Sequence, residues 1–407
     1  MDKRRYGIIS IPVIIGALGY FVDIYDLLLF GIIRKTSLRS LGLSEEMVLT
    51  SGEFIISVQM IGLLIGGILW GVMGDKKGRL SVLFGSIILY SLANIANGMV
   101  QTVNQYALLR FIAGVGLAGE LGAGITLVSE LLPKEKRGLG TSMVAGLGLT
   151  GAVVAYFISK NFDWRVCYYI GGAIGLLLLV LRVSVFESGM FQQVKEMNVS
   201  RGNFFMFFTN KERFFKYVRS ILIGLPTWFV IGVLVTFSDQ FGLHMGVAEA
   251  IDPGRAIMFA YVGISIGDIA IGFVSQALKS RRKALFIFYV LTMICMVLFF
   301  IQRNSSASVM YLLCGGLGFA TGFWAIFVTM AAEQFGTNVR ATAATTVPNM
   351  VRGSLPLIIL LFKWLRGATD FITGGIITAI VIMIIAWIAA YFTKETFGKD
   401  LMYVETR

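Results

Sequence analysis

Apolar residues fill most of this chain in twelve runs of about 20 residues, separated by short polar segments. A helix of that length crosses the roughly 30 Å hydrocarbon core of a bilayer, so each run predicts one transmembrane helix. The predicted spans are 7–33, 53–73, 80–100, 105–131, 138–159, 165–185, 217–237, 254–277, 284–302, 308–331, 340–364 and 371–392.

A polar stretch between the sixth and seventh runs divides the chain into two halves. It extends from Glu187 to Lys216 and is rich in Lys, Arg and Glu, which is typical of a linker. The pattern predicts an all-α membrane protein with twelve transmembrane helices in two pseudo-symmetric six-helix bundles. The predicted parts are an N-terminal bundle (1–188), a cytoplasmic linker (189–216), a C-terminal bundle (217–393) and a cytoplasmic tail (394–407).

The two halves carry related polar motifs at equivalent junctions. In each half, a Glu followed seven residues later by an Arg closes one apolar run and opens the next. The two occurrences are Glu130 with Arg137 and Glu333 with Arg340. In addition, the segment 71–79 (GVMGDKKGR) has a weaker counterpart in 272–282 (GFVSQALKSRR). Two related membrane halves are typical of a secondary transporter, which binds its substrate between them.

Composition excludes a soluble protein. Hydrophobic residues make up 57% of the 407 residues and charged residues 14%, with a mean hydropathy of +0.80. The net charge of +12 would point to nucleic acid in a soluble chain, but Lys and Arg here gather in alternate loops. That distribution predicts cytoplasmic termini in a plasma (inner) membrane by the positive-inside rule, with the lipid bilayer and not nucleic acid as partner.

Residue types that carry enzyme chemistry are sparse. Cys167, Cys295 and Cys314 stand at no metal-ligand spacing, so we expect neither a metal nor another cofactor. The single histidine, His244, lies in a predicted outer loop, where a solvated surface role is the simplest interpretation. The chain shows no nucleophile motif and no phosphate-binding loop, which argues against an enzyme. The first apolar run carries two acids and is too long for a signal peptide.

Charges within the apolar runs are the strongest functional signal, because each is costly to insert into a bilayer. Asp23 and Asp26 are three residues apart, so both carboxylates lie on one face of the first helix. Arg110 and Glu120 lie ten residues apart in the fourth run, and Arg110 is the natural partner of Asp23 or Asp26. We predict a proton-coupling role for these four residues. The alternative is that the two aspartates pair permanently with arginine or lie near the outer surface.

The second half offers a comparable group. Asp268 lies in the eighth run and Arg352 in the eleventh, beside Asn349, and we expect Asp268 to pair with Arg352. Pro348 and Pro356 predict a kink in that eleventh helix. Polar and aromatic residues that would line a central cavity are Tyr25, Gln59, Trp228, Tyr261, Asp268, Trp324, Asn349 and Arg352.

The coupling ion follows from the tally of deeply placed charge. Four acids (Asp23, Asp26, Glu120 and Asp268) face two arginines (Arg110 and Arg352), a surplus of acid that favours proton binding. Sodium stays open as an alternative, because free backbone carbonyls together with carboxylates bind it as well.

Several motifs match one known family. The loop GVMGDKKGR, with Gly71, Asp75, Gly78 and Arg79, resembles the G-x-x-x-D-x-x-G-R signature of the major facilitator superfamily. The segment E-x-x-P-x-x-x-R-G from Glu130 resembles its sugar-porter and metabolite:proton-symporter branches. The helix 1 element D-I-Y-D is similar to the acid-x-Y-D element of the metabolite:proton symporters.

The resemblance implies roles for the loop motifs. A cytoplasmic charge network, or latch, would hold the outward-facing state, and its members in this chain are Gly71, Asp75, Gly78, Arg79, Glu130, Arg137, Glu333 and Arg340. The chain also departs from family patterns. Gln276 replaces the expected acid of the second loop, the Q-Q-x-x-G motif of sugar porters is missing from the seventh helix, and the fifth helix lacks the proline of the antiporter motif.

Together these features predict a secondary active transporter that takes up a small polar metabolite, such as an amino acid or an organic acid, together with protons. We expect it to work as a monomer by alternating access. The alternatives are a proton-antiport exporter of the same fold, sugar or nucleoside uptake, and a membrane sensor that binds ligand without transporting it.

Overall fold

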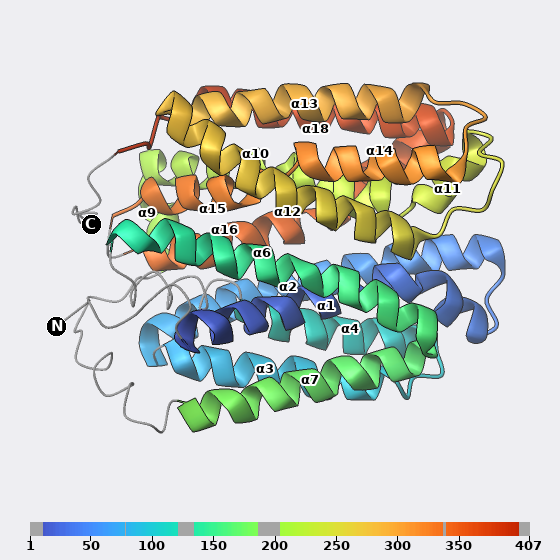
Figure 1. Cartoon of the computed structure of the whole chain (residues 1–407), viewed down its shortest axis with the longest axis horizontal. Coiled ribbons are helices and arrows are strands. Elements are labelled where there is room, and N and C mark those ends of the chain that lie inside the picture. Colours follow the sequence, from blue (N-terminus) through green and yellow to red (C-terminus); the bar gives the residue numbers. More distant parts are fainter. Residues whose placement is uncertain (1–10, 78, 121–133, 186–203, 337–338, 399–407) are drawn as a thin grey trace.

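Helices make up every regular element of the part of the chain that the computed structural model describes (Figure 1). The described residues are 11–77, 79–120, 134–185, 204–336 and 339–398. Side chains are described for these residues except at 11–12, 74–81, 134–143, 183–185 and 340–341.

The first half contains six long helices. They are α1 (Ile11–Ser40), α2 (Glu45–Lys77), α3 (Arg79–Asn97), α4 (Val103–Leu117), α6 (Lys134–Asn161) and α7 (Trp164–Val185). Each overlaps one of the first six predicted spans, and that of α4 is described only to residue 120.

The second half repeats the pattern, but three of its six segments are interrupted. Its elements are α9 (Met206–Thr209), α10 (Lys211–Phe229) with the π-helix η3 (Val230–Val235), α11 (Ser238–His244), α12 (Pro253–Leu278), α13 (Arg281–Ile301), α14 (Ala307–Ala320) with α15 (Trp324–Glu333), α16 (Arg340–Gly353) with α17 (Leu355–Ala368), and α18 (Phe371–Tyr391). The predicted all-α fold with twelve membrane segments is confirmed.

Helical structure begins within the range predicted for the linker. Helix α10 begins at Lys211, inside the predicted linker range 189–216. Asn210 caps this helix by accepting hydrogen bonds from the backbone N–H groups of Glu212 and Arg213. The helix therefore starts where a capping side chain occurs, whereas the prediction placed its start where the apolar run begins.

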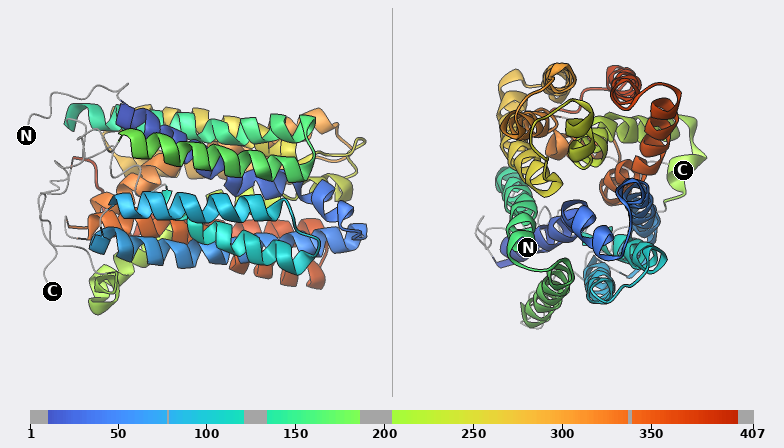
Figure 2. Two further views of the ribbon diagram at one scale, coloured as in Figure 1. Left: turned by 90° about the horizontal axis from the view of Figure 1, so that it is seen from below. Right: turned by 90° about the vertical axis from the view of Figure 1, so that its right-hand side faces the viewer.

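Equivalent helices make equivalent contacts in the two halves. Helix α1 packs on α6 and α7, as α10 packs on α16 and α18, and α2 packs on α4, as α12 packs on α14. The halves meet through α2 against α16 and α17, and through α12 against α6 and α1. Seen from one end, they form two groups of helices, blue to green and yellow to red (Figure 2). The chain is thus pseudo-symmetric in its contacts as well as in its motifs.

Glycines permit the close approach of paired helices within each half. A Cβ atom added to Gly62 of α2 would lie 2.3 Å from the carbonyl oxygen of Phe111 on α4. The equivalent contact in the second half is at Gly263 of α12, where a Cβ atom would lie 2.1 Å from the carbonyl oxygen of Gly315 on α14. Such small residues drive helix packing in a bilayer, where lipid competes for every apolar surface.

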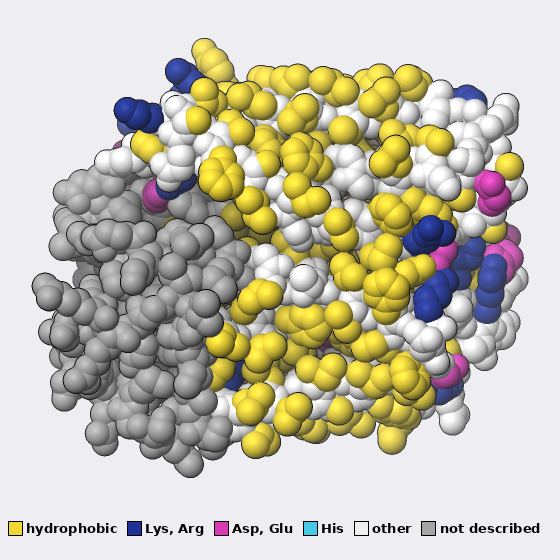
Figure 3. All heavy atoms as spheres, in the orientation of Figure 1, with side chains coloured by type: hydrophobic (Ala, Val, Ile, Leu, Met, Phe, Trp, Pro, Cys, Tyr) yellow, Lys and Arg dark blue, Asp and Glu magenta, His cyan; other side chains and the backbone are white. Residues whose placement is uncertain are grey.

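The outer surface is suited to lipid. Apolar side chains cover the middle of the molecule in Figure 3, whereas charged side chains gather at its right-hand and upper left-hand borders. Nine described helices are long and apolar enough to span a membrane, and Val82–Asn97 is a further, shorter apolar helix. The chain is a multi-pass membrane protein.

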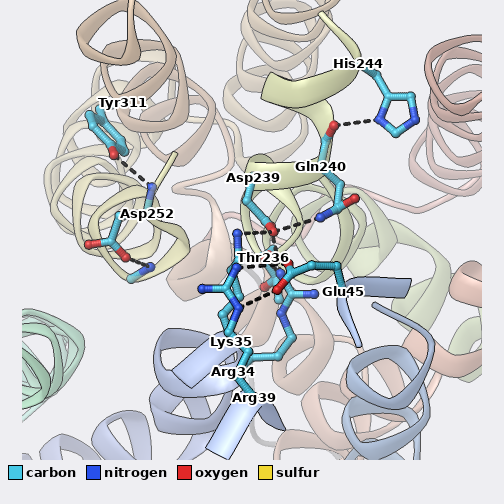
Figure 4. A network of polar contacts seen from close by, with 11 residues as sticks. Arg34, Lys35, Arg39, Glu45, Thr236, Asp239, Gln240, His244, Asp252 and Tyr311 are labelled. Carbon is cyan, nitrogen blue, oxygen red and sulfur yellow. Dashed lines mark hydrogen bonds and ion pairs between the residues drawn. The ribbon is translucent and has the colours of Figure 1, made fainter. Parts of the chain in front are cut away.

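Ion pairs join the two halves at the end of the molecule where α1 finishes and where α2 and α12 begin. We call this end the far end. Asp239 of α11 accepts a hydrogen bond of 2.7 Å from Arg34 of α1, and Lys35 lies 3.3 Å from its other oxygen (Figure 4). Arg34 also stacks on Phe237, with its Cζ 4.6 Å from the ring centre.

Two further sites complete the far-end contact. Glu53 of α2 pairs with both Nη atoms of Arg366 on α17, and Lys363 Nζ lies 3.5 Å from the same carboxylate. Lys160 of α6 lies 2.6 Å from Asp252, which caps α12. We call these three sites together the far-end clamp.

Burial decides which of these pairs matters most. Glu53 is 1% exposed and Asp239 is 6% exposed, so removal of a partner leaves a charge in a medium of low dielectric, at a cost of about 3–5 kcal/mol. Lys160 and Asp252 are much more exposed, and an exposed pair contributes about 0–1 kcal/mol. The far end is therefore held closed mainly by Glu53 and Asp239.

The substitution Glu53→Gln should make the far end more accessible. Thr236 lies across the interface, beside Arg34, and a cysteine placed there reports on separation of the halves. In a chain without its native cysteines, we expect Thr236→Cys to react with a maleimide at least about tenfold faster when Glu53→Gln is also present, because about 1.4 kcal/mol suffices for a tenfold change.

The control is Glu45→Gln, because the Glu45 carboxylate pairs with Arg39 within the same half. Its labelling rate should match that of the parent. Equal labelling rates of Thr236→Cys in the Glu53→Gln and Glu45→Gln variants would contradict the role of the far-end clamp in closing this end.

Candidate functional site

Helix α1 places two carboxylates in the middle of the molecule, and both are completely buried. The Asp26 carboxylate accepts a 2.9 Å hydrogen bond from Arg110 Nη1 of α4, and Arg110 Nη2 donates to the Asp26 carbonyl oxygen at 3.0 Å. Arg110 also donates to Asn94 and to Gln59. Arg110 thus pairs with Asp26, one of the two partners that the sequence offered.

Asp23 faces the other half of the chain. Its carboxylate lies 3.7 Å from Arg352 Nη1 of α16, a distance that allows attraction but exceeds that of a hydrogen bond. Within the described structure, neither carboxylate oxygen of Asp23 has a hydrogen-bond partner, and neither do Nε and Nη1 of Arg352. This pair is the least satisfied buried charge contact that the described residues make between the halves.

Two tryptophans enclose the Arg352 guanidinium. Its Cζ lies 5.8 Å from the ring centre of Trp228 on α10 and 6.0 Å from that of Trp324 on α15. The two rings are 6.5 Å apart at an interplanar angle of 68°. Tyr261 of α12 is buried within electrostatic range of Arg352 and Asp23. We call Arg352, Trp228, Trp324 and Asp23 the central site.

Interruptions of the helices place these side chains. Trp228 lies two residues after Pro226 and two residues before the first residue of the π-helix. Trp324 is the first residue of α15, and Arg352 lies two residues before the break at Ser354 that Pro356 follows. The predicted kink in the eleventh helix is therefore present. Irregular backbone at membrane depth is tolerated where it lines a protein interior, and it often marks functional sites.

The predicted pairing of Asp268 with Arg352 is wrong. The Asp268 carboxylate instead accepts a 3.0 Å hydrogen bond from the backbone N–H of Ala325 at the start of α15. Arg352 faces α1, because α16 packs across the interface between the halves. The sequence could not show this, since it does not reveal which helices of the two halves face each other.

Glu120 is bound within the first half. Both terminal nitrogens of Arg182 on α7 donate to it, at 2.9 and 3.1 Å, and Ser86 donates at 2.9 Å. The tally of buried charge omitted Arg182, which lies near the end of an apolar run. Among the described residues, the five acids with the least exposure (Asp23, Asp26, Glu53, Glu120 and Asp239) each have a cationic partner, whereas Asp268, the fourth acid of the predicted tally, has none.

Three other predicted cavity residues make structural contacts. The Tyr25 hydroxyl donates to the Cys167 carbonyl oxygen of α7 at 2.9 Å, which directs it into the first bundle. Gln59 accepts from Arg110 and donates to the carbonyl oxygen of Leu27. Asn349 of α16 donates to the carbonyl oxygen of Ala118 at 2.9 Å and so connects the halves next to the central site.

The predicted cytoplasmic latch falls only partly within the described structure. Gly71 is buried, and a Cβ atom there would lie 3.3 Å from Thr346 Cγ2 of α16. Glu333 pairs with Arg281 of α13 at 2.8 and 2.9 Å. The remaining predicted members lie outside the described side chains: Asp75, Gly78, Arg79, Glu130, Arg137 and Arg340.

Glu395, at the start of the predicted C-terminal tail, binds next to this pair. The Glu395 carboxylate accepts hydrogen bonds from the Ser280 hydroxyl and from the backbone N–H groups of Arg281 and Arg282 at the start of α13. Partial burial acts to raise the pKa of Glu395, but these donors outweigh it and lower the pKa to about 2. The tail thus fixes the helix end that carries Arg281.

Sequence reasoning missed several residues that connect helices, namely Arg34, Glu53, Arg182, Asp239, Arg281 and Arg366. Most stand near the ends of apolar runs, where a charge is ordinarily solvated. Only the helix contacts reveal that they are buried or paired.

Comparison with known proteins agrees with this architecture. The family model described as Major Facilitator Superfamily matches residues 16–359. The "Niacin transporter NiaP" of Acinetobacter baylyi is 26% identical, and the match covers 94% of this chain and 93% of that protein. The "Benzoate transport protein" of the same organism is 31% identical over 43% of this chain and 39% of that protein.

A solved structure shares the fold. The proton:xylose symporter XylE, bound to 6-bromo-6-deoxy-D-glucose, superposes with a TM-score of 0.70. It covers 96% of this chain and 97% of its own length at 17% sequence identity. The family match extends over most of the described helices. This chain is therefore a multi-pass membrane transporter, not an enzyme, and it belongs to the Major Facilitator Superfamily.

Proposed function

We propose that this transporter takes up a small organic acid together with a proton, by alternating access. The central site carries the proposal: Arg352 is buried between the halves with two N–H donors that lack partners, and two tryptophans flank it. A guanidinium prefers a carboxylate that accepts two parallel hydrogen bonds, and Asp23 at 3.7 Å does not supply them.

The tryptophans favour an acid that carries a flat apolar group. Aromatic rings pack on one another in edge or offset geometry, and Trp228 and Trp324 present two such surfaces beside the charge. The named substrates of the two relatives, niacin and benzoate, are each an aromatic ring with one carboxylate. We therefore assign aromatic monocarboxylates as the first substrates to test.

Coupling follows from charge balance in the central site. When a substrate carboxylate pairs with Arg352, Asp23 loses its only described ion-pair partner. An unpaired carboxylate in a medium of low dielectric is so costly that it takes up a proton instead. Substrate and proton would thus bind together. With Arg352 paired to the substrate and Asp23 protonated, no ion pair would join the halves at the central site, and the halves could then separate there. Asp26 and Arg110 would keep α1 and α4 together during this movement.

The orientation in the membrane forms part of the same proposal. With both termini in the cytoplasm of a bacterial-type inner membrane, the far-end clamp would face outward. The latch of Asp75, Arg79, Glu130 and Arg137 would then close the cytoplasmic side in the alternate state. We further propose that the chain works as a monomer, since each half closes its own bundle.

Transport tests the proposal directly. Proteoliposomes with a neutral interior in an acidic buffer should accumulate radiolabelled niacin or benzoate faster than protein-free liposomes, into which only the uncharged acid diffuses, and a protonophore should abolish the difference. Acid uptake by symport would be rejected if the protein bound no organic acid. It would also be rejected if the protein moved the acid only in the direction opposite to the protons.

The substitution Asp23→Asn should separate exchange from accumulation. The amide resembles the protonated acid, so the variant can still bind and exchange substrate but cannot release a proton. We expect loss of accumulation driven by a pH gradient, with counterflow of labelled benzoate retained. In contrast, Asp26→Asn leaves Arg110 buried without its charged partner and should lower the melting temperature and both activities. Normal accumulation by Asp23→Asn would remove Asp23 from coupling.

The substitution Arg352→Lys should weaken binding of the carboxylate specifically. Lysine keeps the charge but loses the paired geometry, at a cost of about 1.5–3 kcal/mol, or roughly 10- to 100-fold in Kd. Titration with benzoate and with benzamide, its neutral amide, provides the matched comparison. The parent should prefer benzoate, and the variant should lose most of that preference. An unchanged preference would place carboxylate recognition elsewhere.

A further inference from the structure

Asp268 is a membrane acid that the proposed transport cycle does not use. It lies on α12, is half-buried, and has no cation within ion-pair distance among the described residues. Its carboxylate accepts the backbone N–H of Ala325 at 3.0 Å. Ala325 is the second residue of α15, so Asp268 serves the start of a helix to which it does not belong.

Helix α15 needs such a partner. The first N–H groups of a helix have no acceptor within the helix, and a side chain just before it usually supplies one. Here the preceding residue is Phe323, which makes no capping hydrogen bond. A carboxylate also interacts favourably with the positive end of the helix dipole. Asp268, on the neighbouring helix α12, therefore supplies the capping acceptor that the residue just before α15 does not supply.

The backbone of the break lies directly on α12, which explains how Asp268 reaches it. A Cβ atom on Gly322 would lie 2.6 Å from the Gly267 Cα and 2.7 Å from the backbone nitrogen of Asp268. A Cβ atom on Gly267 would lie 2.2 Å from the carbonyl oxygen of Phe319. The two glycines therefore bring the interrupted segment into contact with the residue that caps it.

The first turn of α15, which Asp268 caps, carries Trp324, one of the side chains that form the central site. Trp324 is the first residue of α15, its ring lies 6.0 Å from the Arg352 Cζ, and it packs on Phe327 one turn further on. At its other end, α15 finishes at Glu333, which pairs with Arg281. The half-helix is thus held at both ends, and the direction of its first turn determines where the Trp324 ring lies.

We propose that Asp268 is a positioning residue: by capping α15 it fixes Trp324 against Arg352 and thereby sets the affinity for the flat group of the substrate. The effect on affinity rests on the proposed function. The effect on Trp324 does not, because the cap and the ring are present without a substrate. The two effects can therefore be measured separately.

The ligand-free test uses the fluorescence of Trp324. The difference between spectra of the parent and of Trp324→Phe isolates the emission of this one residue. Asp268→Ala should shift that emission and speed amide hydrogen exchange at the start of α15. Asp268→Asn keeps an acceptor oxygen and should retain most of the Trp324 emission and amide protection of the parent. If the alanine variant fails to fold, the asparagine variant can still be measured. Unchanged Trp324 emission in a folded alanine variant would overturn the proposal.

The substrate test separates positioning from general stability. A lost cap costs about 1 kcal/mol, so we expect KM for benzoate to rise roughly five- to tenfold in Asp268→Ala with little change in the maximal rate. The matched control is Asp370→Ala, which removes the cap of α18, where Asp370 accepts from Ile372 and Thr373. This control should lose similar stability but keep KM.

The outcomes discriminate between the two proposals. Equal KM changes in the Asp268 and Asp370 variants would overturn the positioning role. If the parent transports no organic acid at all, the proposed function fails, whereas a shift of Trp324 emission in Asp268→Ala still supports positioning of this ring by the cap.

Discussion

Pairing of buried charges controls how the helices of this transporter assemble. An ionised side chain enclosed by helices and lipid costs several kcal/mol unless an opposite charge lies beside it. The five acids with the least exposure in the described structure satisfy this requirement, and each pair joins segments that are far apart in the sequence. The positions of the charges therefore specify which helices meet, a task that apolar packing performs poorly when lipid is equally apolar.

These pairs form two classes with different consequences. Arg110 with Asp26 and Arg182 with Glu120 lie within the first half, so they strengthen one bundle. Arg34 with Asp239, Arg366 with Glu53 and Arg352 with Asp23 connect the halves. In the alternating-access cycle that we propose, movement of the halves as rigid bodies would break contacts of the second class and leave the first intact. The geometry of the second class would then contribute most to the energy barrier between the two states.

The sequence predicted the positions of the helices better than it predicted which charged side chains pair. Hydropathy located all twelve segments because a bilayer fixes the length of an apolar helix, and the spacing of Asp23 and Asp26 placed both on one face. In contrast, the pairing of Asp268 with Arg352 was wrong, since it depends on the direction in which α16 faces. Arg182 and Glu53 escaped notice because they stand near the ends of apolar runs. Long-range contacts of this kind are set by packing, which one sequence does not display.

The interruptions of the membrane helices lie unevenly. In the described structure, α1 runs unbroken for 30 residues and α4 ends at Leu117 before a turn, whereas the π-helix, the gap before Trp324 and the break after Arg352 all belong to the second half. This second half also supplies Trp228, Trp324 and Arg352 of the central site. A change in substrate specificity could therefore arise from substitutions in one half alone. Chimeras that exchange second halves between relatives are a natural route to engineering this transporter.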